Sequence, residues 1–297
     1  MLHRDLRQQN RRSWDAVVPA HDSHRAGLAA FLRDGGSTLF PEELALLGDL
    51  AGKTLAHLMC NTGGDTLSLA QLGAQVTGID ISGAAVTRAR ELAGESGIAA
   101  QFVQADVYDW LAQTAASGVR YDRVFCSYGA ICWLPDLDEW ARGVASVLAS
   151  GGRFVLVEFH PTSNMFDAEW QLARSYPHGG RILPIDGVGD YVGASGAGLA
   201  PGGFAEGMPH FQNPEPAHLF QWGVGEVVTA LAGTGLRIEA LREYPFVNGE
   251  KPFTRMRELP GHRLAAPDGT PEMPLMYGVA AVREFGGAAP ENSPSFS

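Results

Sequence analysis

Apolar and polar segments alternate regularly between residues 53 and 159. Short apolar runs that suit buried strands lie at residues 53–59, 74–80, 99–106, 121–129 and 153–159. Segments with helical character separate them, at residues 65–72, 83–96, 107–116 and 137–150. Ser82 and Gly97 are suited to begin and end the second of these helices, and a Gly-Gly pair at 151–152 is expected to end the last. Strands that alternate with helices predict βαβ units, and hence a parallel sheet covered by helices on both faces.

The alternation stops after Phe159 and resumes near residue 222. Residues 160–221 are rich in glycine, proline and aromatic residues and have no long periodic segment, which is typical of a lid or binding element. A helix at 225–235 and strands at 236–246 and 275–285 follow. These two strands have no helix between them, which favours antiparallel pairing. The expected fold class is α/β, with a Rossmann-like, doubly wound, mostly parallel seven-stranded sheet, an antiparallel last strand and a large insertion after the fifth strand.

The same pattern divides the chain into five parts. We expect an N-terminal helical cover segment (1–50), a cofactor-binding α/β core (51–159), a substrate-binding insertion or lid (160–221), the C-terminal part of the core (222–285) and a disordered tail (286–297). The stretch "SWDAVVPAHDSH" has no long apolar periodicity, so it suits a cover segment more than a core helix.

Composition narrows the classes of protein that fit. The chain has 297 residues, of which 45% are hydrophobic, so a sizeable core is available. A net charge of -11 argues against a nucleic-acid partner. The polar N-terminus lacks the apolar core of a signal peptide, and no apolar run is long enough to span a bilayer. Cys60, Cys126 and Cys132 have no metal-ligand spacing, so we expect no metal site and a cytoplasmic protein. The oligomeric state is left open.

Polar residues follow successive strands at the edge where α/β proteins bind ligands. A turn, "NTGG" at 61–64, follows the first strand, Asp80 ends the second and Asp106 follows the third. A carboxylate at Asp80 can accept hydrogen bonds from a ribose diol, and one at Asp106 can accept from the amine of adenine. The turn and the two acids together predict an adenosine site.

The turn does not have the G-x-G-x-x-G pattern of dinucleotide-binding proteins. The three positions hold Asn61, Gly63 and Thr66, so two of the three glycines are absent. Asp65, in the first turn of the next helix, would repel a phosphate. A ligand with a cationic sulfonium and no phosphate therefore suits the site better than a nicotinamide dinucleotide.

Several segments, in the right order, resemble class I S-adenosylmethionine-dependent methyltransferases of the small-molecule branch. They are "LAHLMCNTG" at 55–63, "GIDIS" at 78–82, "ADVYDW" at 105–110 and the whole of 121–159. In the first segment His57 takes the place of the family's acid, and Met59 and Asn61 take the place of two glycines. The resemblance implies S-adenosyl-L-methionine as the cofactor. The residues expected to contact it are Met59, Cys60, Asn61, Gly63, Asp65, Asp80, Ile81, Asp106, Val107, Ser127 and Tyr128.

The sequence gives weaker indications of the residues that bind the methyl acceptor. His160 follows the fifth strand directly and is our candidate for a general base, although an acceptor that ionises easily would need none. The residues expected to contact the substrate are His21, His24, Tyr128, Trp133, His160, Tyr191 and His210. The function predicted from these features is methyl transfer to an O, N or C atom of a small organic metabolite. The alternatives are a nicotinamide-dependent oxidoreductase and a non-catalytic cofactor-binding interaction module.

Overall fold

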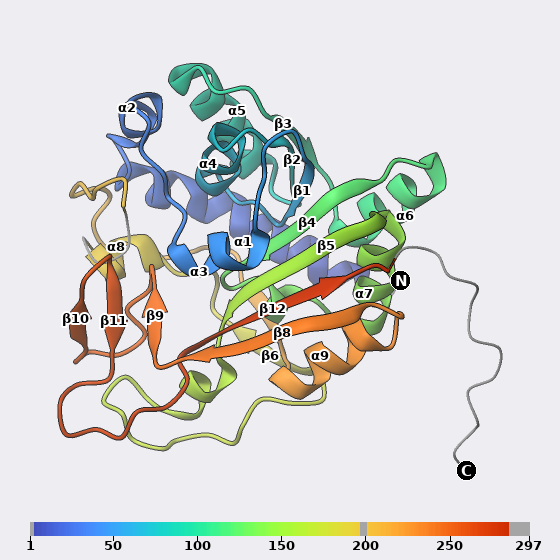
Figure 1. Ribbon diagram of the computed structural model, residues 1–297. Coiled ribbons are helices and arrows are strands. Elements are labelled where there is room, and N and C mark those ends of the chain that lie inside the picture. Colours follow the sequence, from blue (N-terminus) through green and yellow to red (C-terminus); the bar gives the residue numbers. More distant parts are fainter. Residues whose placement is uncertain (1–2, 197–200, 285–297) are drawn as a thin grey trace, which may run out of the picture.

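A seven-stranded sheet forms the centre of the computed structural model, which describes residues 3–196 and 201–284 (Figure 1). Its strands are β1 (Thr54–Leu58), β2 (Gln75–Asp80), β3 (Gln101–Gln104), β4 (Tyr121–Ser127), β5 (Leu148–Phe159), β8 (Arg237–Tyr244) and β12 (Met276–Val282). The strand order is β3-β2-β1-β4-β5-β12-β8. Strands β1 to β5 pair in parallel, and β12 is antiparallel to both of its neighbours. The fold class predicted from the sequence is confirmed.

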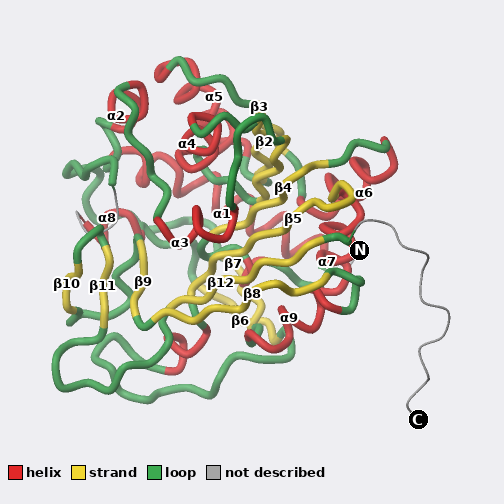
Figure 2. Tube along the Cα trace, in the orientation of Figure 1, coloured by secondary structure: helices red, strands yellow, loops and turns green. Residues whose placement is uncertain are grey.

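Helices cover both faces of this sheet (Figures 1 and 2). The helices on one face are α3 (Pro41–Leu47), α4 (Gly64–Gln71) and α5 (Gly83–Ser96), and those on the other are α6 (Val107–Ser117), α7 (Leu137–Val147) and α9 (Val224–Ala232). Side chains of a strand point alternately to the two faces, so Leu55 packs on the first face and Ala56 on the second. Trp140 of α7 is fully buried and contacts the Phe154 ring edge-on, with 5.4 Å between the ring centroids. Both faces are therefore apolar, as the continuous apolar strands predict.

The expected helix boundaries hold for α5 but not for α7. The Ser82 hydroxyl accepts from the backbone N–H of Ala85, and Gly97 ends α5 in a left-handed conformation. Helix α7 was predicted to reach residue 150 and ends at Val147 instead. Leu148 is fully buried and pairs with Tyr121, so the sheet takes these residues and β5 begins earlier than expected. Tertiary pairing thus outweighs the local helical preference.

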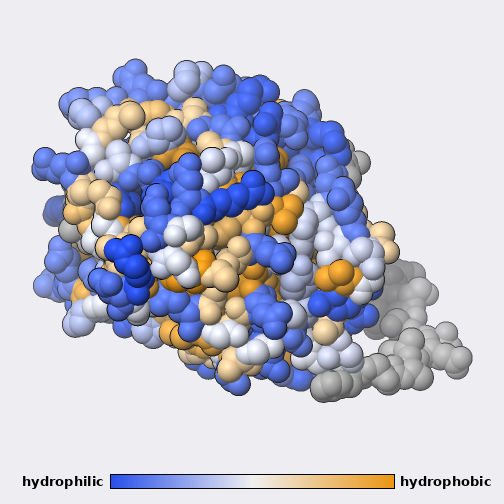
Figure 3. All heavy atoms as spheres, turned by 90° about the horizontal axis from the view of Figure 1, so that it is seen from above, coloured by the Kyte–Doolittle hydropathy of each residue, from blue (hydrophilic) through white to orange (hydrophobic). Residues whose placement is uncertain are grey.

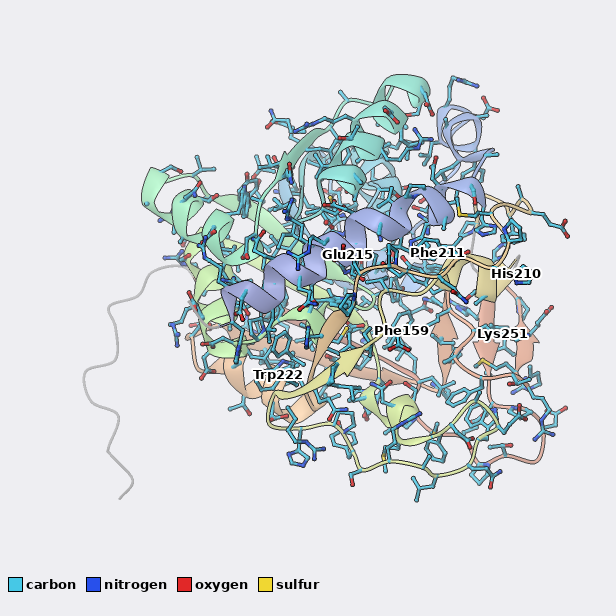
Figure 4. The ribbon with its side chains drawn as sticks, turned by 180° about the vertical axis from the view of Figure 1, so that it is seen from behind. Phe159, His210, Phe211, Glu215, Trp222 and Lys251 are labelled. Carbon is cyan, nitrogen blue, oxygen red and sulfur yellow. The ribbon has the colours of Figure 1, made fainter. Side chains whose placement is uncertain are left out.

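The N-terminal region is a long helix that bridges distant parts of the chain. Helix α1 (Arg4–Ser23) packs against α5, against β7 (Ala217–Gln221) and against α8 (Tyr191–Ser195), and α2 (Leu28–Arg33) follows it. Asn10 exchanges two hydrogen bonds with the backbone of His218, with lengths of 2.8 and 2.7 Å. Figure 4 shows α1 running across the molecule. A helical cover segment was expected here, but its length and its partners were not, because the buried face of α1 carries Arg7, Asn10, Ser13 and His21 beside only three apolar residues.

Two excursions leave the sheet. Between β5 and α9, residues 160–221 contain η2 (Pro161–Met165), β6 (Arg181–Ile185), α8 and β7, and β6 pairs with β7. Between β8 and β12, where the sequence indicated only a loop, lie β9 (Phe246–Asn248), β10 (Arg257–Leu259) and β11 (Arg263–Ala265), which form a second sheet in the order β10-β11-β9. The expectation of a loop was therefore wrong, because strands of three residues are too short to give a periodic signal in the sequence. The division of the chain into five parts stays a prediction, and residue 285 and the proposed tail at 286–297 lie outside the described residues.

None of the helices within residues 3–196 and 201–284 is both long and apolar enough to cross a membrane. Hydrophilic residues cover most of the face seen in Figure 3, and hydrophobic residues occupy smaller areas toward its middle.

Candidate active site

A cavity of about 1010 Å³ opens at the carboxyl ends of the parallel strands. Its walls come from the sheet edge, from α1, and from both excursions, including β9 and the residues that follow it. All of the residues predicted to contact the cofactor line this cavity: Met59, Cys60, Asn61, Gly63, Asp65, Asp80, Ile81, Asp106, Val107, Ser127 and Tyr128. The structure therefore brings the predicted cofactor residues together, although no bound ligand tests their contacts.

The turn after β1 keeps a left-handed backbone at each position where the family has glycine. The φ angles are 57° at Met59, 50° at Asn61 and 80° at Gly63. A left-handed conformation costs a non-glycine residue about 1–2 kcal/mol, so other contacts must hold the turn. The backbone N–H of Asn61 donates to Asp80 Oδ2 at 2.8 Å, and Asn61 Oδ1 accepts from the backbone N–H of Thr62 at 2.7 Å. These hydrogen bonds stabilise a left-handed backbone that glycine would adopt with little strain.

Of the three positions Met59, Asn61 and Gly63, only Gly63 holds glycine, and packing explains why. A Cβ at this position would lie 2.7 Å from Phe102 Cε1 and 2.9 Å from Ala89 Cβ. Helix α4 begins immediately after it, at Gly64. The glycine thus lets the turn lie directly against α5 and β3.

Asp80 ends β2 with its carboxylate held by two backbone donors. Oδ2 accepts from Asn61 N–H at 2.8 Å, and Oδ1 accepts from Ser82 N–H at 2.9 Å. Burial raises the pKa of Asp80 to about 6, against the effect of these two hydrogen bonds. Each carboxylate oxygen has a further lone pair, so the group can still accept from a ligand that lies in the cavity.

Asp106 begins α6 and also pairs with α1. Its Oδ1 accepts from the backbone N–H of Tyr108 at 3.0 Å and from Arg7 Nη1 at 2.8 Å. The second oxygen, Oδ2, is buried and accepts no hydrogen bond in the described structure. An orphaned acceptor on the wall of a cavity fits a ligand that carries an N–H donor, such as the amine of adenine.

His57, at the position of the family's acid, is a neutral part of the core. Its Nδ1 lies 2.9 Å from Thr66 Oγ1 and its Nε2 lies 3.3 Å from Ser127 Oγ. Burial lowers the pKa of His57 to about 3, so the imidazole is uncharged at neutral pH. The imidazole ring connects α4, which follows the turn, to the end of β4. Unlike the family's acid, it places no negative charge beneath the turn.

The residues predicted to contact the substrate divide into two groups. Tyr128, His24, Trp133 and Tyr191 line the cavity, whereas His21, His160 and His210 do not. Tyr191 accepts a hydrogen bond of 3.2 Å from Asn61 Nδ2, which brings the insertion onto the cofactor turn.

The histidines outside the cavity have other surroundings. The His21 ring lies beside the ring of Tyr191, with 4.3 Å between centroids, and its Nε2 lies 3.1 Å from the carbonyl oxygen of Gly189. Burial lowers the pKa of His21 to about 4. His210 is exposed in a loop of the insertion, and Figure 4 shows it toward the outside of the molecule, away from Phe159.

His160 is held by groups outside the cavity. Its Nδ1 lies 3.0 Å from Thr162 Oγ1, and its Nε2 lies 3.0 Å from Glu243 Oε1. The side chain is buried against the edge of the Tyr277 ring, and burial lowers the pKa of His160. Both nitrogens are occupied, so the geometry favours a role in joining η2 to β8.

We expect His160→Ala to destabilise the fold and to leave catalysis nearly intact. Loss of two side-chain hydrogen bonds should lower the free energy of unfolding by about 1–3 kcal/mol. Urea unfolding and steady-state kinetics measure the two effects separately. A turnover number lowered about 100-fold, with unfolding unchanged, would instead make His160 a general base.

Several residues that line the cavity were not predicted from the sequence. Arg25 donates to Thr62 Oγ1 at 3.2 Å beside the turn and forms no ion pair within the described residues. Asn248 and Glu250 come from the excursion between β8 and β12. Arg25 could have been found from its place directly after His24. The other two gave no signal, because nothing in their local sequence places them at the carboxyl edge of the sheet.

Comparison with known proteins supports the predicted class. Residues 56–152 match a family model described as a methyltransferase domain. A ubiquinone biosynthesis O-methyltransferase of Xanthomonas euvesicatoria pv. vesicatoria (strain 85-10) is 33% identical over 136 residues, which is 44% of this chain and 55% of the relative. The chain thus spans about half the length of the relatives that it matches first.

Solved structures share the fold. An S-adenosylmethionine-dependent methyltransferase of Mesorhizobium loti has a TM-score of 0.51 and 22% identity, covering 82% of this chain and 96% of that one. A second, from Methanosarcina mazei, has a TM-score of 0.50 and 16% identity, covering 84% of this chain and 100% of that one.

Residues 56–152 thus match a methyltransferase domain, and the sheet has the fold of the S-adenosylmethionine-dependent methyltransferases described above, in agreement with the class that the sequence predicted. S-adenosyl-L-methionine is the cofactor of this class. The comparisons give no support to a nicotinamide-dependent oxidoreductase or to a non-catalytic interaction module.

Proposed function

We propose that this chain transfers the methyl group of S-adenosyl-L-methionine to an oxygen atom of a small organic molecule. The observation that carries the proposal is the cavity, in which the turn, Asp80 and Asp106 face aromatic and apolar residues of α1 and the two excursions. Its volume of about 1010 Å³ suits a nucleoside cofactor and a small acceptor together. An oxygen acceptor is favoured by the relatives named O-methyltransferases. Nitrogen and carbon acceptors are the alternatives.

The polar groups of the cavity suit the different parts of the cofactor. Asp80 would accept from the ribose hydroxyls, and Asp106 Oδ2 from the adenine amine. Arg25 would bind the carboxylate of the methionine moiety, and Asp65 would balance its ammonium group. Burial raises the pKa of Asp65, whereas the hydroxyl of Thr38 and the charge of Arg25 lower it. Arg25 is therefore close enough to act on Asp65 without forming an ion pair within the described residues.

The chain must also orient the acceptor and exclude water. S-adenosyl-L-methionine, when bound, supplies a methyl group that its sulfonium has already activated. What the residues contribute is therefore placement of the acceptor oxygen at near-attack distance, in a closed site. Trp14 of α1 contacts the rings of Trp133 and Tyr191 edge-on, with centroids 5.4 and 6.5 Å apart. These rings join the N-terminal helix, the segment that follows β4 and the insertion over one wall of the cavity.

We expect S-adenosylhomocysteine to raise the melting temperature of the protein. A ligand present at 100 times its dissociation constant adds about 2.7 kcal/mol of stability to the folded state. NAD and NADP should give no shift, because the turn lacks the glycine pattern and the helix start carries Asp65. Differential scanning fluorimetry with the three ligands makes the comparison. A shift with NAD or NADP and none with S-adenosylhomocysteine would refute the proposed function.

A further inference from the structure

Glu250 differs from every other carboxylate that lines the cavity. The others each accept hydrogen bonds within the described structure, and they are Asp65, Asp80, Asp106, Glu158, Asp167 and Asp190. Glu250 accepts none and forms no ion pair with any described residue. Glu250 lines the cavity and is partly buried there. A carboxylate of this kind is available to a bound molecule.

The carboxylate of Glu158 also lines the cavity, but its oxygens already accept hydrogen bonds from the backbone. It accepts from the backbone N–H groups of Gly129, Ala130, Ile131 and Phe159. It therefore fixes the loop after β4 and has little capacity left for a ligand. Glu158 and Glu250 lie close enough for the charge of Glu158 to act on Glu250.

The position of Glu250 relative to the cofactor turn follows from its other neighbours. Burial raises the pKa of Tyr191, and the charge of Glu250 raises it further. Burial, followed by the charges of Glu158 and Glu250, also raises the pKa of the Cys132 thiol. Tyr191 is bonded to Asn61 of the turn, and Cys132 follows the end of β4. Glu250 thus lines the same cavity as Tyr191 and Cys132 and lies close enough to both for its charge to act on them.

The cations of the cavity do not reach Glu250. Arg7 is paired with Asp106, Arg174 donates to the carbonyl oxygens of Asn164 and Phe166, and Arg25 acts on the turn. Lys251, the next residue, has an exposed side chain. The environment of Glu250 is therefore apolar and negative, which suits a group that gains a proton.

We propose that Glu250 is the general base of the reaction and removes the proton from the acceptor hydroxyl. This inference rests on the proposed function and names a catalytic residue for it. The acceptor oxygen forms a bond to the methyl carbon as the carbon–sulfur bond breaks, and the electron pair of that bond neutralises the sulfonium to a thioether. The hydroxyl proton passes to the Glu250 carboxylate and then to solvent.

The ionisation of Glu250 suits this role near neutral pH. Burial, together with the charge of Glu158, raises the pKa of Glu250 to about 7. A base is most effective when its pKa lies near the working pH. The group must be ionised before it can accept a proton, so kcat/KM should rise with pH through about 7 and then level off.

Two measurements on the full chain test the proposal, with Glu250→Gln as the variant and Glu243→Gln as the matched control. The first is a ¹³C NMR titration of labelled glutamate carboxyl groups, which needs no acceptor. The resonance lost in Glu250→Gln should titrate near pH 7 in the wild type. The second is methyl transfer to phenol and to 4-nitrophenol at pH 8, where 4-nitrophenol is already largely ionised. Calorimetry with S-adenosylhomocysteine checks that each variant is folded and binds the cofactor.

We expect Glu250→Gln to bind S-adenosylhomocysteine normally and to methylate phenol at least 100-fold more slowly. Transfer to 4-nitrophenol should fall much less, and the rise in rate near pH 7 should disappear, whereas Glu243→Gln should behave as the wild type. A Glu250 resonance that titrates near pH 4, or equal losses with the two phenols, overturns the proposal. If the wild type methylates neither phenol, a Glu250 resonance that titrates near pH 4 still overturns the proposal. Failure of the proposed function looks different, because the wild type would then not bind S-adenosylhomocysteine.

Discussion

Replacing Arg7 with methionine is expected to lower the free energy of unfolding by about 3–5 kcal/mol. Arg7 and Asp106 form a nearly inaccessible ion pair of 2.8 Å, with 5% and 6% of their side chains exposed. Methionine has a similar length but no charge, so the Asp106 carboxylate would stay buried without its cation. Urea unfolding of the wild type and the variant at pH 8 measures the difference.

The size of this effect should depend on pH. Burial raises the pKa of Asp106, and the Arg7 charge lowers it, so removal of Arg7 should raise that pKa further. A group whose folded pKa is raised binds its proton more readily in the folded state than in the unfolded state. Protonation removes the uncompensated charge, and the loss of stability should therefore be largest at pH 8 and smaller at pH 5.

Arg12→Met is the matched control for Arg7→Met. Arg12 lies on the same helix and pairs with Glu215 at 3.1 Å, but the two side chains are 50% and 37% exposed. An exposed pair contributes about 0–1 kcal/mol. Equal losses in the two variants would show that the Arg7–Asp106 pair is not effectively buried in solution.

Asp80→Ala is expected to weaken the binding of S-adenosylhomocysteine at least 100-fold. Two hydrogen bonds from ribose hydroxyls to a carboxylate are each worth about 1.5–3 kcal/mol. The variant also loses the acceptors that hold the backbone N–H groups of Asn61 and Ser82. Isothermal titration calorimetry measures the affinity.

Asp122→Ala separates this effect from a general loss of stability. Asp122 also holds a strand end, since its Oδ2 accepts from the backbone N–H and hydroxyl of Thr54, both at 2.9 Å. It lies at the amino end of β4, on the opposite edge of the sheet from the cavity. This variant should be less stable but should bind S-adenosylhomocysteine normally. Unchanged affinity in Asp80→Ala would show that Asp80 does not bind the ribose.

Binding should also depend on pH through Asp80. Its pKa is about 6, because burial outweighs the hydrogen bonds that it accepts from Ser82 and Asn61. Ribose hydroxyls donate to the ionised form, so ligand binding should lower this pKa. Affinity for S-adenosylhomocysteine should accordingly be full above pH 7 and fall as the pH drops through 6, with protons released on binding.

Much of the sheet and of the cofactor side was predictable from local patterns. The apolar runs and helix signals gave the alternation, and Ser82 and Gly97 bounded α5 correctly. The turn, Asp80 and Asp106 were placed together without a structure, because parallel strands present their carboxyl ends at one edge. The tertiary structure corrected α7, which gives up its last residues to the sheet pairing of Leu148 with Tyr121.

The acceptor side was much less predictable. His160 gave a local signal directly after β5, yet both of its nitrogens are bonded outside the cavity. Glu250 gave none, because it follows a strand of only three residues in a segment that looked like a loop. Whether a polar residue faces a cavity depends on the packing around it, which periodicity does not encode.

The sequence by itself determined the α/β architecture, the order of its strands along the chain and the acids that follow them, since each depends on residues close together in the chain. Only the tertiary structure decided how α1 is held and how the cavity is completed. Arg7 and Asp106 are 99 positions apart, and Asn10 and His218 are 208 apart. The buried face of α1 carries several polar side chains, and their hydrogen-bond partners come from distant segments. Such contacts form only when the whole chain has folded, and for that reason the residues nearest the acceptor were the hardest to predict.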